Sequence, residues 1–170
     1  MAADYLVSSL PALEFDAPAP MSLERFDSLC REQLGPNPFA GLEKVWADLD
    51  SQMRNAAAEE RARLRGKDAA EWRRPAQGCA LYWQNRMRAA FAEKDPAVRE
   101  RLIDKVRWDA AGEMTPPASP LSKGAAFTYR IRLEIAVRRQ AITQAAGNSV
   151  LETILDGPLH PNPSPLTTNH

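Results

Sequence analysis

Histidine is almost absent from this sequence. The only two, His160 and His170, lie in a proline-rich stretch at the C-terminal end. A Ser/His or Cys/His nucleophile system and an imidazole metal site therefore lack their central residue in the part of the chain that should fold. Neither of the common phosphate-binding patterns, GxxxxGK(S/T) and GxGxxG, occurs. We expect no cofactor, no metal and no enzymatic activity.

The sequence also has no net charge and no long apolar run. Lys plus Arg number 22 and Asp plus Glu number 22, so no strong field draws the chain to nucleic acid or to an anionic membrane. No apolar run approaches the roughly 20 residues of a membrane helix. Residues 1–4 carry no basic start of a signal peptide. We expect a soluble, cytoplasmic protein.

Cysteine is scarce as well. Cys30 and Cys79 lie in separate apolar segments and form no CxxC pair. A free cysteine is usually a small buried hydrophobe, and intracellular thiols stay reduced. The sequence therefore predicts two buried thiols in a reducing compartment.

Apolar residues at helical spacing are what the chain does contain. Ser22 is the expected N-cap of a helix that ends at Gly35. Over residues 39–65 apolar residues recur in steps of three and four as far as Ala56. Beyond that point the helix is strongly charged and should pack thinly or project, with Gly66 at its C-terminal end.

Further helices are expected over residues 79–94 and from Asp95 to about Gly112, because an aspartate followed by proline is a strong helix start. Ser119 followed by Pro120 predicts the start of the next helix in the same way, with a polar N-cap residue and proline at the first helical position.

The segment 121–146 is ambiguous in its pattern. Apolar residues alternate from Phe127 to Val137, as in a strand. The alanine-rich flanks and the length of about 25 residues favour a helix that ends at Gly147. A capping box at residues 149–152 predicts a last short helix.

These elements predict an all-α fold, an irregular bundle of five or six helices arranged as one bundle or as two lobes. Residues 1–157 should form one helical domain. Its first 21 residues are an extended arm, because prolines limit any helix or strand to about residues 5–10. Residues 158–170 should form a disordered proline-rich tail.

Carboxylate pairs are the remaining source of catalytic chemistry. Asp109 and Glu113 lie one helical turn apart, as do Glu100 and Asp104. Such pairs can serve acid/base catalysis but are common on solvated helix faces. An acid/base enzyme using Asp109 and Glu113 is the least favoured interpretation.

Arginine gathers in two regions. Residues 54–74 interleave arginines with acids and carry one aromatic, Trp72, which favours a solvated face or a protein contact over nucleic acid. The second region comprises Arg130, Arg132, Arg138 and Arg139. Three of these four should face away from the core and be free for an acidic partner. Trp108 lies off the apolar stripe of its helix, so it is either a core residue or an exposed interface anchor.

Several stretches carry a family resemblance. They are residues 5–13, which read YLVSSLPAL, then residues 22–30, 95–109 and 128–139, and residues 53–66, which match the form LRN-x-LA-x-x-RA-x-R-x-G. In this order they resemble an uncharacterised bacterial family encoded in V-type ATP synthase operons. The likeness extends over about residues 5–155. The chain departs from the family over residues 110–122, where the family's acidic and aromatic residues are replaced.

The resemblance implies a counterpart of the C subunit of V-type ATP synthases, called d in eukaryotes, which sits on the rotor ring and receives the central stalk. Such a protein couples rotation mechanically and does no chemistry. It would be cytoplasmic, peripheral to the inner membrane through the complex, without direct membrane insertion and without nucleic acid. The alternatives are a transient assembly factor or regulator of that complex, or a generic helical protein-interaction module.

The candidate interface residues follow from the arginine clusters, the tryptophan and the family-like stretches. They are Arg54, Asn55, Arg61, Arg65, Arg107, Trp108, Asp109, Arg130 and Arg138.

Overall fold

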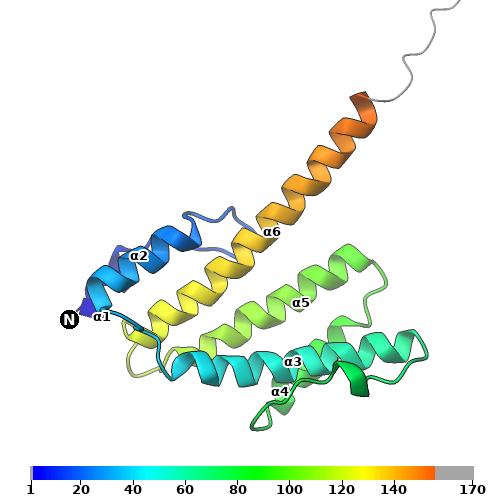
Figure 1. The fold of residues 1–170 in the computed structure, drawn as a ribbon, viewed down its shortest axis with the longest axis horizontal. Coiled ribbons are helices and arrows are strands. Elements are labelled where there is room, and N and C mark those ends of the chain that lie inside the picture. Colours follow the sequence, from blue (N-terminus) through cyan, green and yellow to red (C-terminus); the bar gives the residue numbers. More distant parts are fainter. Residues whose placement is uncertain (1, 156–170) are drawn as a thin grey trace, which may run out of the picture.

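The computed structural model describes residues 2–155, which form six α-helices and two 3₁₀ turns and contain no strand. The helices are α1 (Ala2–Ser9), α2 (Leu23–Leu34), α3 (Leu42–Leu64), α4 (Leu81–Ala90), α5 (Pro96–Ala110) and α6 (Lys123–Leu155), and the 3₁₀ turns are η1 (Ala70–Trp72) and η2 (Ala111–Met114). The predicted all-α class is confirmed (Figure 1). Within the described range, no helix combines the length and apolar character needed to cross a bilayer.

The helix ends predicted at Ser22, Gly35 and Asp95 are confirmed. The Ser22 hydroxyl accepts a hydrogen bond from the Arg25 N–H at 3.3 Å, and the Asp95 carboxylate accepts one from the Ala97 N–H at 2.8 Å. The N–H of Gly35 donates to the Arg31 carbonyl. These bonds satisfy backbone groups that have no partner within the helix.

Helix α3 ends at the predicted glycine. Gly66 has φ of +63°, and its N–H donates to the Arg63 carbonyl at 3.2 Å. The next N–H, of Lys67, reaches the Ala62 carbonyl at 2.9 Å. This pair of bonds is a Schellman motif, which needs a left-handed residue after the helix and therefore favours glycine.

The N-terminal region begins as a helix and continues as an arm. Helix α1 contributes Leu6, which is fully buried, and Phe15 in the following segment is 8% exposed. The arm therefore packs on the body. Of the helix or strand expected near residues 5–10, the structure shows the helix, which starts earlier, at Ala2.

The boundaries of α6 differ from those predicted. The helix starts at Lys123, with the Ser122 hydroxyl accepting from the Ala125 N–H at 3.4 Å, so the start predicted at Ser119 and Pro120 is wrong. It continues past Gly147 to Leu155, so the predicted stop and the separate helix over residues 149–152 are wrong as well. Glycine within a helix costs only about 1 kcal/mol relative to alanine, which does not suffice to end one.

The strand-like alternation in α6 has a packing cause. The helix contacts α1, α2, α5 and η2, so more than one of its faces is covered. Phe127, Ile131, Leu133 and Ile135 are all at most 3% exposed. A helix enclosed on several sides loses the single apolar stripe of a surface helix.

The core has two hydrophobic clusters. The first joins the N-terminal arm, α1, α2 and α6 with Trp108 of α5 and with η2, and in it Phe26 is stacked on Tyr129 at a centroid distance of 5.4 Å. The second joins α3, α4 and α5 around Met53 and Met87. Trp46 and Leu49, near the start of α3, pack against both. Figure 1 shows α6 extending beyond the other helices.

Two smaller expectations are settled by burial. Of the two outcomes expected for the charged half of α3, the structure shows packing rather than projection, because Ala57 and Ala62 are at most 3% exposed while the arginines beside them stay exposed. Cys30 is buried as predicted, but Cys79 is exposed because it lies in the segment before α4, outside both clusters. The predicted tail over residues 158–170 lies outside the described residues.

Candidate protein-interaction surface

The first arginine region forms a hollow against α3. Arg54, Arg61 and Arg65 are separated by seven and four residues, which places them on one stripe of the helix. They line a hollow of about 260 Å³ together with Trp72 and Arg74 from the returning chain; Ala58 and Ala62 complete the lining. We call these seven residues the arginine hollow. Three of the candidate residues are thus brought together.

The short side chains in the stripe create this space. Ala58 and Ala62 place no bulk between the arginines, and Trp72, 46% exposed, stands at the side of the hollow. Trp72 and Arg74 were not among the candidate residues, because local sequence does not show that the chain after Gly66 folds back against α3. The segment 66–74 returns along α3 only after the Gly66 turn.

Asn55 positions this returning segment. Its amide nitrogen donates to the Arg74 carbonyl at 2.8 Å, and its amide oxygen accepts from the Arg74 N–H at 2.8 Å. One side chain thereby completes both backbone hydrogen bonds of Arg74, as a neighbouring strand would. Asn55 is therefore a positioning residue that holds the backbone of Arg74 at the hollow.

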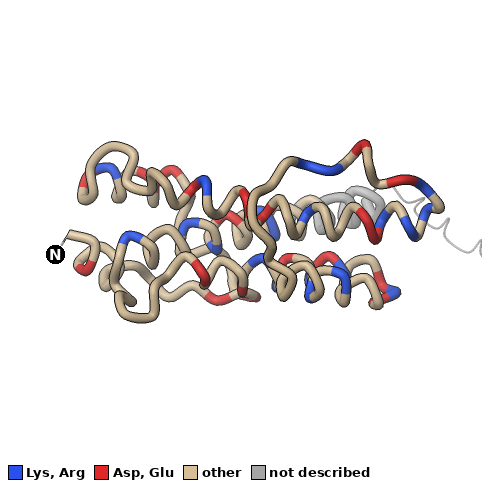
Figure 2. The backbone as a smooth tube through the Cα atoms, turned by 90° about the horizontal axis from the view of Figure 1, so that it is seen from below, with Lys and Arg blue, Asp and Glu red and all other residues tan. Residues whose placement is uncertain are grey.

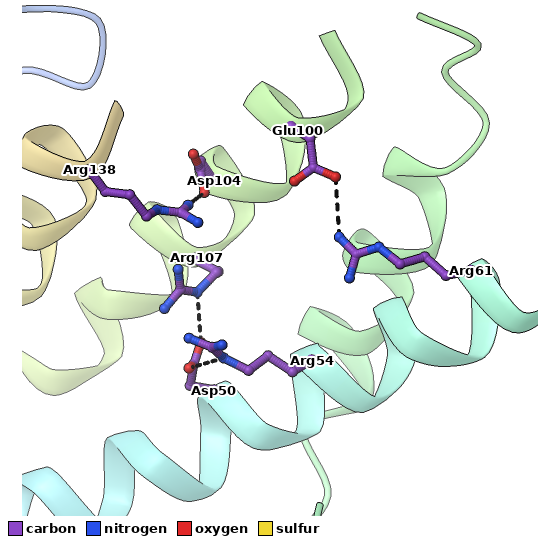
Figure 3. Close-up of polar contacts among 7 residues, drawn as sticks. All are labelled: Asp50, Arg54, Arg61, Glu100, Asp104, Arg107 and Arg138. Atoms are coloured by element: carbon purple, nitrogen blue, oxygen red, sulfur yellow. Dashed lines mark hydrogen bonds and ion pairs between the residues drawn. The ribbon is translucent and has the colours of Figure 1, made fainter. Parts of the chain in front are cut away.

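The arginines of the hollow differ in their partners (Figure 3). Arg54 pairs with Asp50 at 2.6 Å, and Arg61 pairs with Glu100 of α5 at 3.2 Å. Among the side chains that the structure describes, no carboxylate pairs with Arg65 or Arg74, and both residues are exposed. Two cations of the hollow thus remain available to an anionic group from outside.

Arg107 belongs to the joint between α3 and α5. Its Nε atom lies 2.7 Å from Asp50, whose other oxygen pairs with Arg54 (Figure 3). The side chain of Arg107 is 12% exposed. A largely buried charge must be paired to be tolerated, so this contact holds two helices together.

Trp108 is a core residue. It is 6% exposed, makes an edge contact with Phe15 at 5.4 Å, and lies under the guanidinium of Arg132 at 5.3 Å. Of the two interpretations of this tryptophan, the structure shows the buried one. Phe15 of the N-terminal arm and Ala111 and Met114 of η2 belong to the same hydrophobic cluster.

The second arginine region is engaged within the molecule. Arg130 pairs with Asp27 at 2.9 Å, Arg132 donates to the Trp108 carbonyl at 3.1 Å, and Arg139 pairs with Asp16 at 3.1 Å. Arg138 pairs with Asp104 (Figure 3). The expectation that three of these arginines are free for a partner is wrong, because their acceptors come from distant parts of the chain.

The carboxylate pairs occupy separate surroundings. Asp109 pairs with Lys105 and, at 3.3 Å, with Arg86, whereas Glu113 is exposed. Glu100 is exposed and pairs with Arg61, whereas Asp104 is 6% exposed. Burial raises the pKa of Asp104, and the nearby cations, Arg138 first, oppose this shift. No pair combines two free carboxyl groups.

Charge is interleaved over the described chain. Figure 2 shows basic and acidic residues alternating along most of the backbone, without a large block of one sign. The arginine hollow is therefore a local feature, set by which side chains remain unpaired. Comparison with known proteins adds no further assignment: no protein-family model, no curated protein and no solved structure matches this chain.

Proposed function

We propose that this protein is a non-catalytic protein-binding component whose arginine hollow receives an acidic segment of a partner protein. One observation carries this proposal. Four guanidinium groups, those of Arg54, Arg61, Arg65 and Arg74, border a single hollow, and two of them have no carboxylate partner in the described chain.

The chemistry of the hollow matches such a ligand. A guanidinium presents a planar fork of donors that binds a carboxylate through two parallel hydrogen bonds. Trp72 provides exposed aromatic surface beside these groups. Arginine and tryptophan are the residues most enriched among those that contribute most to protein interfaces. An acidic segment with an apolar side chain would engage both.

The family resemblance suggests the identity of the partner. It points to the central stalk or the rotor ring of a V-type ATP synthase, with this chain as a C- or d-like adaptor. A transient assembly factor or regulator would use the same surface. The two roles differ in stoichiometry, because a subunit remains in the finished complex and an assembly factor leaves it.

The hollow is tested by reversing its unpaired charges. Arg65→Glu combined with Arg74→Glu should weaken partner binding at least about tenfold, since each lost charge-assisted contact is worth about 1.5–3 kcal/mol. Helix content, measured by circular dichroism, should not change. Arg63→Glu is the matched control, because Arg63 lies near the same helix end on the other side of α3. Equal binding by the double variant and this control would remove the hollow from the interface.

The partner is tested by co-purification. A tag inserted after Leu166, gentle solubilisation of native membranes and quantitative mass spectrometry identify what accompanies the full chain. V-type ATP synthase subunits in near-equal amounts support the adaptor, and substoichiometric recovery supports the assembly factor. If the protein runs alone as a soluble species, the link to the rotary complex is lost.

A further inference from the structure

A second concave surface lies on the opposite side of α3. It measures about 760 Å³ and is bordered by the first half of α3, the segment 77–80, the start of α4 and η2. Val45 on this side and Arg54 in the arginine hollow are nine residues apart, which is two and a half helical turns. The two surfaces therefore face different ways. We call this one the apolar groove; Val45, Leu49, Tyr82, Trp83 and Met114 are its large apolar lining residues.

The apolar groove exposes an unusual amount of hydrophobic side chain. Val45 is 55% exposed and Tyr82 is 64% exposed. Leu81, adjacent in sequence, is 58% exposed. The chain has no charged residue from Pro75 to Asn85, in a protein whose other surfaces are densely charged. Contiguous apolar surface of this kind on a soluble protein marks a binding site.

The rim of the groove is held in place by a buried amide. Gln52 is 9% exposed, and its nitrogen donates to the Gln77 carbonyl at 2.7 Å. Its oxygen accepts from the Ala80 N–H at 2.6 Å and from the side chain of Gln84 at 3.1 Å. The segment 77–80 is thus fixed to α3 before any ligand arrives, which reduces the entropy lost on binding.

The charge of the groove selects among apolar ligands. Its only charged lining residues are Asp48 and Glu113. The guanidinium of Arg86 lies over the rings of Tyr82 and Trp83, 6.0 and 5.5 Å from their centroids, but it pairs with Asp109 at 3.3 Å, so its charge is balanced within the protein. The Asp48 carboxylate accepts a hydrogen bond from the Gln77 N–H at 3.0 Å, whereas Glu113 is exposed and makes no ion pair with any side chain that the structure describes. A ligand with an apolar ridge and basic flanks matches this distribution, and an acidic ligand is repelled.

We propose that the apolar groove binds a basic amphipathic helix of a partner protein. A helix places apolar residues at intervals of three and four on one face and basic residues beside them, which is the pattern the groove requires. The groove lies beside α3 and α4, where a third helix can pack. With the arginine hollow, the protein then has two docking sites of opposite charge preference on opposite sides of α3. The groove proposal stands independently of the hollow.

The test uses the full chain and a designed probe. The probe is a fluorescein-labelled helical peptide with leucines on one face and lysines on the other, and the control peptide carries glutamates in place of the lysines. Fluorescence anisotropy should show at least tenfold tighter binding of the lysine peptide. Tyr82→Ser should weaken its binding at least tenfold. Tyr5→Ser, which removes a similarly exposed tyrosine from α1, should leave the binding of the lysine peptide unchanged.

A second variant isolates the charge. Glu113→Gln alters an exposed carboxyl group without touching the core, and it should weaken the lysine peptide several-fold and reduce the salt dependence of binding. Equal binding of the two peptides, or unchanged binding in Tyr82→Ser, would overturn the proposal. Sedimentation provides the remaining outcome: a dimer that Tyr82→Ser dissociates would show a second copy in the groove and overturn the basic helix as its occupant. None of these variants touches the arginine hollow.

Discussion

At the scale of single residues, the described structure depends on polar side chains that complete backbone hydrogen bonds. Asn55 and Gln52 lie on α3, and each bonds main-chain groups of the segment that returns along the helix. This segment lacks regular secondary structure over residues 73–80, so its backbone groups need partners from elsewhere. The two amides therefore position both candidate docking surfaces.

Asn55→Ala tests this role. It removes two hydrogen bonds to Arg74 at a partly exposed site, so we expect a loss of about 1–2 kcal/mol in the free energy of unfolding. The Arg74 amide should lose protection in hydrogen exchange, while the α2 amides keep theirs. Asn55→Asp is the informative companion, because it retains the acceptor and loses the donor. Unchanged exchange at Arg74 in the alanine variant would contradict the role.

At the scale of elements, the start of α6 packs closely against η2. A Cβ atom built on Gly124 would lie 3.0 Å from Pro116 Cδ and would overlap the Met114 carbonyl oxygen. Backbone of η2 cannot move aside as a flexible side chain can. Gly124 is therefore required by this contact, although helix propensity alone would favour alanine there.

Gly124→Ala therefore distinguishes helix propensity from close packing, because the two effects change the free energy of unfolding in opposite directions. Propensity predicts stabilisation of up to about 1 kcal/mol, whereas overpacking predicts destabilisation of about 1–3 kcal/mol. We expect destabilisation, measured by urea unfolding. Gly112→Ala is the control, because its Cβ meets only the end of the Arg132 side chain at 3.5 Å. Similar effects of the two substitutions would show that α6 and η2 are not in tight contact.

The contact between α5 and α6 contains a buried carboxyl group, that of Asp104, whose burial disfavours its ionised form. Asp104 is 6% exposed, and burial raises its pKa despite the pairing with Arg138. A carboxyl with a folded-state pKa above the unfolded value binds its proton more tightly when folded. Its contribution to stability is full below the unfolded pKa and is lost as pH rises through the folded pKa.

Asp104→Asn should remove this dependence. In urea unfolding from about pH 4 to pH 7, the free energy of unfolding of the parent minus that of the variant should fall as pH rises. Asp16→Asn should give the opposite slope, because its hydrogen bond from Arg101 lowers the Asp16 pKa and stabilises the folded state above the unfolded pKa. Parallel slopes for the two variants would refute the assignment at Asp104.

At the scale of the whole molecule, α3 connects two hydrophobic clusters. Trp46 and Leu49 are the residues that pack against both. The ion pair between Asp50 and Arg107 lies one turn further along and joins α3 to α5. Helix α5 also contributes to both, with Trp108 in the first cluster and Val106 in the second. The two clusters should therefore unfold together, and the start of α3 should carry a large part of this coupling.

Trp46→Ala should weaken this connection. Truncation of a fully buried large aromatic costs about 3–5 kcal/mol, and we expect about 2 kcal/mol here because Trp46 is only partly buried. Amides of α2 and of α4 should exchange with one common free energy in the parent protein and with two different ones in the variant. Identical exchange energies for α2 and α4 in the variant would show that the clusters are joined elsewhere.

The sequence by itself determined the class of fold and the helix ends at four capping residues of this protein. Ser22, Gly35, Gly66 and Asp95 act through hydrogen bonds to residues at most five positions away, so their effects are visible in local sequence. The apolar spacing that identifies α3 and α4 is also a local pattern. Local sequence fails to predict the end of α6, because the modest cost of a glycine such as Gly147 within a helix does not decide whether the helix stops.

Tertiary structure alone decided which charged and apolar side chains remain available. Local sequence does not distinguish the unpaired Arg65 from Arg130, Arg138 and Arg139. The latter three form ion pairs with carboxylates on other elements of the fold. Trp72 and Arg74 reach the hollow only because the chain returns along α3. Pairing between residues far apart in sequence depends on how the helices pack, so a local sequence pattern cannot predict it. The class of fold was therefore predictable, whereas which surface side chains remain unpaired was not.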